Sequence, residues 1–396
     1  MPNQKSYLFT SEAVSPGHPD KVADQISDAI LDAFLAKDPH ARVACETLVT
    51  ADYVFLAGEM RSTHAAEVMA DIEKVVRKTI ARIGYEHGLE RHFDAATVKI
   101  QNHLHAQAAE IAQGVDAGDR DSDGAGDQGI MFGYACDETP ELMPAPLHYA
   151  HELLRRLQKR RLVDKRLRPD AKSQLTFVYE NGRPVRVHTL LVSHQHAPEL
   201  TQALFTDIVV EEAKAMLGNL FTAETRVLVN PTGSFVNGGP ATDTGLTGRK
   251  IIVDSYGGSA HHGGGAFSGK DPTKVDRSAA YIARYLAKNI VAAKLATKCE
   301  IQLCYAIGVP EPLAIYVDTH GTAAQGVTED AISAAIYKTV DLRPRGLRER
   351  LGLAAPIYEA SAQACHFGHA PDSMGKGTFG WERTDIAEQL KKAVLG

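Results

Sequence analysis

The spacing of hydrophobic and polar residues is typical of helices in some segments and of strands in others. The same order of these segments recurs three times along the chain. The first round predicts a helix, two strands and a second helix, over residues 19–35, 42–50, 53–60 and 65–83. The second predicts a helix from about Leu147 and then two strands and a helix, over 174–179, 185–193 and 201–217. The third predicts the same order over 275–295, 300–307, 313–318 and 329–340.

The three rounds start roughly 125–130 residues apart, which indicates a weak internal triplication. Plain alternation of elements in an α+β protein is the alternative explanation. Asn181-Gly182 between two alternating segments is typical of a tight hairpin. Pairs of consecutive strands favour antiparallel sheets with helices on one face over a doubly wound parallel sheet.

Composition narrows the class of protein. A net charge of −6 over 396 residues argues against non-specific nucleic-acid binding, which needs a basic face. The five cysteines are odd in number and form no Cys-x-x-Cys pair, so we expect buried thiols in a reducing cytoplasm. No segment reaches the length of apolar sequence that a membrane span needs.

The most informative segment is the glycine-rich run over residues 256–271. It follows an apolar segment, 251–253, that predicts a strand, and its backbone N–H groups would allow a large anion to approach closely. The run nearly spells a Walker A loop that ends on Gly269-Lys270, but Asp271 stands where that loop needs Ser or Thr. The segment therefore indicates a polyphosphate and argues against a P-loop NTPase.

Cations bracket this run in a chain that is acidic overall. Arg249 and Lys250 precede it, and Lys270 and Lys274 close it. Four cations around one glycine-rich stretch are hard to explain as solubility charges, so we expect them to bind phosphate groups.

A second anion site is predicted at the start of the first helix. Pro19 suits the first helical position, and His18 and Lys21 would flank an anion at the free N–H groups there. A capped helix with incidental charges is the alternative.

Asp20 and Asp276 both lie at the start of predicted helices. They could hold Mg²⁺ beside phosphate oxygens, or could simply interact favourably with the helix dipole.

Other residues leave two interpretations open. Lys172 at a strand could point into a cleft or be a solvated turn charge. Phe235 between glycines could stack on a base or belong to the core. His103 and His105 lack a third metal ligand, so we expect a flexible polar loop. Cys45 precedes Glu46 in an alternating strand, which favours a buried thiol over a nucleophile.

Five motifs together resemble the S-adenosylmethionine synthetase family, in its bacterial form, from about Tyr7 to Trp381. They are Gly17-His18-Pro19-Asp20-Lys21, Gly124-Ala125-Gly126-Asp127-Gln128-Gly129, Arg168-Pro169-Asp170-Ala171-Lys172-Ser173-Gln174, Asn230-Pro231-Thr232-Gly233 and Gly263-Gly264-Gly265-Ala266-Phe267-Ser268-Gly269-Lys270-Asp271. The resemblance implies a methionine adenosyltransferase. Methionine sulfur attacks C5′ of ATP and displaces tripolyphosphate, which is hydrolysed to pyrophosphate and phosphate before release.

The resemblance also implies site residues. His18, Lys172, Arg249 and Lys270 would be catalytic. ATP would contact His18, Asp127, Asp170, Lys172, Ser234, Phe235, Asp243, Arg249, Lys250, Ala266 and Lys270. Methionine would contact Glu59, Gln107, Asp243 and Lys274. Asp20 and Asp276 would bind two Mg²⁺ ions per active site, and Glu46 one K⁺ per subunit.

The fold implied is α+β, with three similar domains about a pseudo-threefold axis, over residues 1–106, 122–239 and 240–396. Residues 107–121 would form a mobile active-site loop. A homodimer or a dimer of dimers is implied, with active sites at the dimer interface.

The chain departs from the family pattern in three places. Gln107-Ala108-Ala109-Glu110-Ile111 lacks a Pro that bacterial members commonly carry, which should make this segment less rigid. Ser234 stands where an Arg is often found, so one nucleotide contact is in doubt. His261 replaces a variable residue.

Two other functions fit the same cations. Another ATP-dependent phosphotransferase would yield ADP and a phosphorylated acceptor instead of a sulfonium product. A nucleotide-binding regulator without activity would not need both predicted magnesium carboxylates and a lysine for the leaving group.

Overall fold

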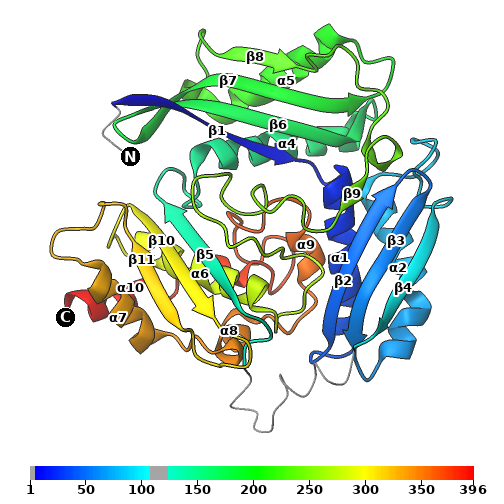
Figure 1. Cartoon of the computed structure of the whole chain (residues 1–396). Coiled ribbons are helices and arrows are strands. Elements are labelled where there is room, and N and C mark those ends of the chain that lie inside the picture. The colour runs from blue at the N-terminus through cyan, green and yellow to red at the C-terminus, as the bar shows by residue number, and fades with distance from the viewer. Residues whose placement is uncertain (1–4, 108–123) are drawn as a thin grey trace.

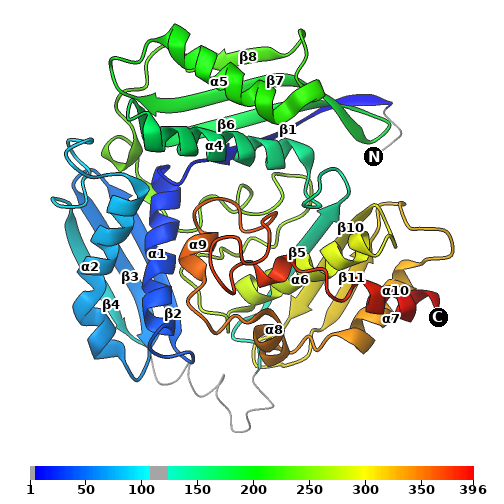
Figure 2. The same cartoon turned by 180° about the vertical axis from the view of Figure 1, so that it is seen from behind.

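Three sheets, each covered by helices on one face, make up the structure. The computed structural model describes residues 5–107 and 124–396. In Figure 1 the sheets face the viewer, and Figure 2 shows the helices that cover them from behind. This arrangement confirms the α+β class and the helices on one face of each sheet.

The first sheet has the order β4-β3-β2-β9. Its strands are β2 (Arg42–Thr50), β3 (Tyr53–Arg61), β4 (Lys99–Ala106) and β9 (Gly245–Leu246), and its helices are α1 (Pro19–Leu35) and α2 (Ala65–Ile83). His18 caps α1, since its side chain accepts a hydrogen bond from the N–H of Asp20. Gly84 ends α2 with a left-handed φ of 113°, which a glycine adopts without strain.

The second sheet has the order β1-β6-β7-β8. Its strands are β1 (Ser6–Val14), β6 (Leu167–Glu180), β7 (Arg183–His196) and β8 (Arg226–Val229), covered by α4 (Ala145–Val163) and α5 (Gln202–Leu217). Asn181 and Gly182 both have positive φ, 50° and 77°, which confirms the predicted tight hairpin between β6 and β7.

The third sheet has the order β11-β10-β5. Its strands are β5 (Gly129–Cys136), β10 (Lys298–Tyr305) and β11 (Ala314–Asp318), and α6 (Val275–Ala292) packs against it. Further helices are α7 (Glu329–Thr339), α8 (Pro344–Leu351), α9 (Tyr358–Ser361) and α10 (Ala387–Leu395), with 3₁₀ turns at Gly218–Leu220, Gly239–Ala241 and Gly380–Glu382.

Each sheet borrows a strand from a distant part of the chain. β1 pairs with β6, β5 with β10, and β9 with β2, all antiparallel. The expected antiparallel pairing is not complete, because β4 runs parallel to β3 and β8 parallel to β7. The exchange brings segments that are far apart in sequence to the centre of the molecule.

Two details of the sequence analysis are wrong. Residues 251–253 form no strand. They lie in a run of turns in which Asp254 N–H donates to Lys250 O (2.8 Å) and Gly257 N–H to Ile252 O (3.0 Å). His103 and His105 lie on the edge strand β4 rather than in a flexible loop. A short apolar or polar segment forms a strand only where the edge of a sheet lies beside it, and its sequence does not show whether such an edge is present.

Candidate active site

Four aspartates, spaced four residues apart, line one face of α1 and hold the loops beside it. Asp20 and Asp24 accept the N–H groups of Leu246 (3.0 Å) and Gly248 (2.9 Å), which belong to one segment. Asp28 accepts the N–H of Gly269 (2.8 Å), and Asp32 accepts those of Tyr358 and Glu359 (3.0 and 2.8 Å). Two of these segments carry the predicted phosphate cations. We did not predict this ladder from the sequence, although a spacing of four places side chains on one face of a helix.

The first cluster of charges comprises His18, Asp20, Lys172, Arg249 and Lys250. Asp20 Oδ2 lies 2.5 Å from Lys250 Nζ, and Asp20 Oδ1 lies 3.6 Å from Arg249 Nε. Burial opposes ionisation of Asp20, but hydrogen bonds from Lys250 and the Leu246 N–H outweigh it and lower the pKa. Lys172 lies opposite Val14 on the β1–β6 ladder, with its side chain exposed.

Lys21 does not belong to this cluster, contrary to expectation. Its side chain is fully buried, with Nζ 2.6 Å from Asp254 Oδ1 and 3.0 Å from Asp24 Oδ2. Burial opposes its charge, but these two carboxylates raise its pKa. Lys21 therefore ties α1 to the turn that precedes the glycine run, and it is not available to an anion.

His18 is a neutral donor in this cluster. Burial, together with the positive charges of Lys250 and Lys172, lowers its pKa to about 3. Nδ1 accepts the Asp20 N–H (3.2 Å), so the ring proton lies on Nε2. A neutral imidazole with a fixed tautomer can donate a hydrogen bond to an anionic oxygen without any change of charge.

We expect His18 not to titrate between pH 5 and 8, because its folded pKa lies near 3. The unfolded chain binds this proton near pH 6.5, so His18 removes stability from the native state as the pH falls from about 6.5 toward 3. Nitrogen-detected NMR of histidine-labelled protein, with a His18→Asn spectrum for assignment, measures this directly. A His18 midpoint near 6.5 would contradict the prediction.

Several of the residues predicted to contact ATP or methionine lie beside the first cluster. Asp170 is buried, its Oδ2 accepts the Gly239 N–H (2.8 Å), and burial raises its pKa to about 7. Its Oδ1 is buried without a hydrogen-bond partner among the described residues. Asp243 is exposed and lies near enough to Asp170 to act on its charge.

His196 holds Phe235 in place at both ends of the residue. His196 N–H donates to Phe235 O (2.9 Å), and the Phe235 N–H donates to His196 Nε2 (3.3 Å). His196 Nδ1 lies 2.9 Å from Ala197 O, which places the ring proton on Nδ1. Phe235 is half-buried and its neighbour Ser234 is exposed, so the ring can meet a ligand on one side.

The second cluster comprises Glu46, Lys270, Asp271, Lys274 and Asp276. Lys270 Nζ lies 2.6 Å from Asp276 Oδ2, and Lys274 pairs with the buried Asp271. Burial raises the pKa of Glu46, against the charge of Lys270 nearby. Three of the predicted residues, Glu46, Lys270 and Asp276, therefore lie near one another, and Lys274 pairs with Asp271 a few residues away along the chain.

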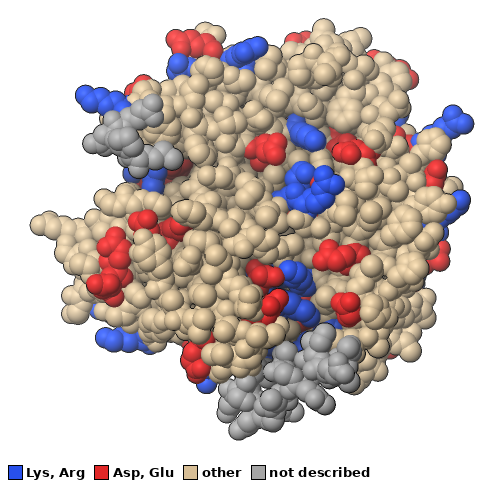
Figure 3. Space-filling view, in the orientation of Figure 1, with Lys and Arg blue, Asp and Glu red and all other residues tan. Residues whose placement is uncertain are grey.

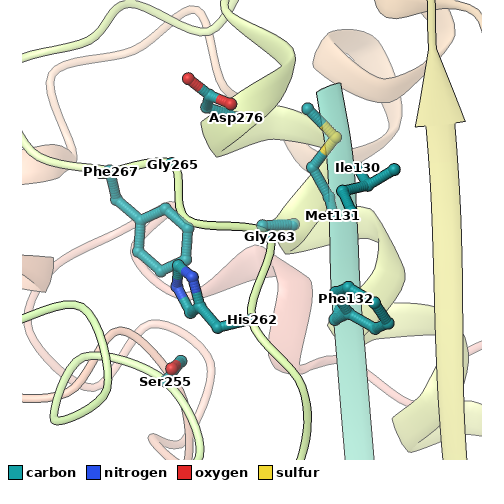
Figure 4. A pocket seen from close by; sticks show the side chains of 10 residues that line it. Ile130, Met131, Phe132, Ser255, His262, Gly263, Gly265, Phe267 and Asp276 are labelled. Atoms are coloured by element: carbon teal, nitrogen blue, oxygen red, sulfur yellow. The ribbon is translucent and has the colours of Figure 1, made fainter. Parts of the chain in front are cut away.

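The glycine run reaches this cluster by passing close to β5 and α6, as Figure 4 shows. A Cβ on Gly263 would lie 1.7 Å from Ile130 O, and one on Gly265 would lie 2.5 Å from the Asp276 carboxyl group. Only glycine fits at position 263, and a side chain at position 265 would displace the Asp276 carboxyl group. α6 starts at Val275, several residues after Lys270, so the loop does not have Walker A geometry, in which a helix follows the lysine at once.

The remaining predicted residues are more dispersed. Glu59 on β3 lies 3.7 Å from His105, and Gln107 N–H donates to Met60 O (3.0 Å). Asp127 Oδ1 accepts the N–H of Gln128 (2.7 Å), and Ala266 faces Gly248. The predicted mobile loop, residues 107–121, lies outside the described residues except for Gln107.

The carboxylates present suit the expected metal ions. Asp20 and Asp276 each pair with a lysine through one oxygen, and no described residue donates to Asp276 Oδ1. Carboxylate oxygens beside phosphate groups are the ligands that Mg²⁺ prefers. Glu46 makes no ion pair among the described residues, so its carboxylate is not occupied by a side-chain cation.

The two clusters lie on the face of the molecule that carries the sheets. Figure 3 shows charged side chains of both signs near the middle of this face. No ion pair among residues 5–107 and 124–396 joins a member of the first cluster to a member of the second. A polyphosphate carries more negative charge than a single cation can neutralise. Several cations, together with carboxylates that can bind divalent ions, suit such a ligand.

Three α+β units with two such clusters define a class of enzyme that handles a nucleoside polyphosphate. Models of the N-terminal, central and C-terminal domains of S-adenosylmethionine synthetase match residues 6–109, 122–235 and 237–383. The chain belongs to the S-adenosylmethionine synthetase family.

Bacterial relatives match over nearly their whole length. The S-adenosylmethionine synthase of Paramagnetospirillum magneticum is 56% identical over 395 residues, which cover 99% of this chain and 100% of the relative. That of Parvibaculum lavamentivorans is 55% identical over 394 residues, covering 99% of both chains. That of Roseobacter denitrificans is 56% identical over 399 residues, covering 99% of this chain and 100% of the relative.

Proposed function

We propose that this chain forms S-adenosyl-L-methionine from ATP and L-methionine, as a methionine adenosyltransferase. The observation that carries the proposal is the first cluster, in which a neutral His18 and the cations Lys172, Arg249 and Lys250 surround one point beside Asp20. Members of one family, more than half identical over full length, support the same activity here.

The reaction needs no general base. The methionine sulfur is a neutral nucleophile without a proton to lose, so it attacks C5′ directly and the C5′–oxygen bond to the tripolyphosphate breaks. Alignment of sulfur, carbon and oxygen supplies roughly 7–11 kcal/mol of such a barrier. The other large contribution is stabilisation of the negative charge that develops on the departing oxygen.

We assign that stabilisation to His18 and Lys172. The Nε2–H of His18 and the ammonium group of Lys172 donate to the departing oxygen, while Arg249, Lys250 and Lys270 hold the phosphates. Lys250 and Lys270 are paired with Asp20 and Asp276 in this structure. Phosphate oxygens would take over these lysines and leave the two carboxylates to bind Mg²⁺, which supplies further positive charge to the phosphate chain.

The substrate contacts follow from the same arrangement. Phe235 stacks on adenine, with Asp127, Asp170, Ser234 and Ala266 around the nucleoside. Glu59 pairs with the methionine ammonium group, Gln107 and Lys274 meet its carboxylate, and Asp243 contacts methionine or the nucleoside. Glu46 binds K⁺. The finer division into units 1–106, 122–239 and 240–396 accompanies this proposal, with one strand exchanged in each sheet.

Incubation with ATP, methionine and magnesium tests the function. Mass detection of S-adenosylmethionine, together with phosphate and pyrophosphate in equal amounts, is the expected result. ADP with a phosphorylated acceptor would overturn it.

Self-association as a homodimer or a dimer of dimers is part of the proposal, with the two clusters of one chain serving different active sites. The outer face of the third sheet supports it. Ile130 on β5 and Tyr316 on β11 point away from α6 and are 44% and 58% exposed. Exposed apolar sheet faces of this kind are typical of protein–protein contacts.

We expect Tyr316→Glu to yield monomers and to abolish most activity, because a charge would be buried at the contact and each site would lose its partner's half. Sedimentation velocity and the sulfonium assay measure the two effects. Tyr337→Glu on α7, which changes a tyrosine that is 54% exposed on another element, is the matched control. A fully active dimeric Tyr316→Glu would contradict the proposed interface.

A cytoplasmic location also belongs to the proposal, supported by five free cysteines, four of them buried. Within the described parts of the chain, none of the helices combines the length and the apolar character of a membrane span.

A further inference from the structure

A cavity opens on the helical side of the molecule, apart from the two charged clusters. It encloses about 280 Å³ where α4 meets the end of α2 and the segment that follows α9, so it touches all three parts of the chain. Figure 2 shows these helices on the side opposite the sheets. Its apolar lining includes Val14, Ile83, Leu154 and Leu162.

The charged residues that line this cavity are all positive. They are Arg82, Arg155, Lys159 and Arg161, and no Asp or Glu is among the lining residues. Such a set is unexpected in a chain whose net charge is −6. The positive potential inside this small apolar hollow favours an anion.

Two of these cations lack a carboxylate partner. Among the described residues, Arg161 donates to the oxygen of Gln158 (2.8 Å) and to Ile83 O (2.8 Å), and the exposed Lys159 makes no ion pair. Arg82 and Arg155 do pair, with Glu359 (2.9 Å) and Glu152 (3.1 Å). Arg155 makes its ion pair through Nε, without hydrogen-bond geometry.

We propose that this cavity binds a small amphipathic carboxylate, with its head among the four cations and its short apolar body on the lining of Leu154, Leu162 and Ile83. Guanidinium groups bind carboxylates through paired hydrogen bonds, and the cavity's volume suits a small organic ligand. An apolar body without a head would leave Lys159 and Arg161 without a carboxylate partner, and a cation would be repelled.

The cavity communicates with the first cluster through two short paths. Arg82 donates to the side-chain oxygen of Gln25 (3.1 Å), and Gln25 donates to Pro16 O (2.8 Å), two residues before His18. Val14, which lines the cavity, pairs with Lys172 across the β1–β6 ladder. A ligand that draws Arg82 away from Gln25 would therefore shift the segment that carries His18. This regulatory consequence rests on the proposed function, whereas the binding itself does not.

Calorimetric titration of the purified full chain with octanoate tests the binding. We expect one octanoate per chain, no binding of octylammonium, and affinity reduced about tenfold, or ~1.4 kcal/mol, in Lys159→Glu. Lys165→Glu, an exposed lysine on the same unit that does not line the cavity, should bind as wild type. Equal affinity in Lys159→Glu, or binding of octylammonium as strong as that of octanoate, would overturn the proposal.

A second pair of variants tests the apolar part. Leu162→Asp should lose octanoate binding, whereas Val163→Asp should keep it, since both residues are exposed but only Leu162 lines the cavity. Loss in both or in neither variant counts against the site.

Finally, octanoate should change the KM for ATP in wild type and not in Lys159→Glu. A chain that binds octanoate yet makes no sulfonium product would leave this site standing and overturn only the proposed function.

Discussion

Lys172→Met is expected to lower the rate of sulfonium formation by roughly 10²–10³-fold, the usual effect of removing one donor from a developing oxyanion. Lys172 is exposed on β6, and its charge acts on His18 at the centre of the first cluster. Methionine keeps the length of the side chain but donates nothing to the departing oxygen. Arg249, Lys250 and Lys270 remain, so ATP should still bind.

Single-turnover assays with mass detection measure the rate, and equilibrium titration with a non-hydrolysable ATP analogue measures binding. Lys165→Met, which removes an exposed lysine outside the cluster, should retain full activity. The loss of a neighbouring cation should also raise the pKa of His18, a change that NMR can follow. Normal turnover in Lys172→Met would refute its role at the leaving group.

Arg277→Met is expected to destabilise the fold by roughly 3–5 kcal/mol, because it leaves a buried carboxylate unpaired. Arg277 and Asp28 are both fully buried and form two hydrogen bonds of 2.6 and 2.7 Å. The Arg277 guanidinium group also lies over the ring of Tyr358, at 4.1 Å from its centroid. Chemical denaturation monitored by the fluorescence of Trp381 measures the loss.

The same pair anchors the backbone of Lys270, the lysine that we propose to hold phosphate. Arg277 donates to Lys270 O (3.1 Å), and Asp28 accepts the Gly269 N–H (2.8 Å). The double variant Asp28→Leu with Arg277→Met should recover much of the stability, since apolar residues often replace a buried ion pair at little cost. It should not recover activity, because Gly269 and Lys270 lose both anchors. Full activity in the double variant would show that the anchors are dispensable.

Local patterns predicted the regular elements well. The helices at Pro19–Leu35 and Ala65–Ile83 begin and end where the spacing of apolar residues placed them. The Asn181-Gly182 hairpin is confirmed by its two positive φ angles. Helix periodicity, capping residues and tight turns depend on contacts between residues that are close in sequence. Such contacts can be predicted from the order of the residues alone.

Other elements could not be predicted, because the strands with which they pair lie far away in the chain. β1 and β5 are held by β6 and β10, more than 150 residues distant in each case, and no local pattern shows which edge will accept them. Residues 251–253 looked like a strand, but Asp254 and Val253 are drawn into contacts with Lys21 and His151. An apolar run of this length is compatible with a strand or with a buried turn.

The sequence by itself determined the class of fold and, through its motifs and the family they belong to, the chemistry and the residues expected to perform it. Only the tertiary structure decided which of those residues meet. The predicted residues lie in two clusters, whereas Lys21 lies outside them, in a buried ion-pair network. Four aspartates of α1 hold the loops that carry the cations. The reason is physical. Residue type and local spacing set what a side chain can do, whereas burial and long-range hydrogen bonds set where it is held and whether a ligand can reach it.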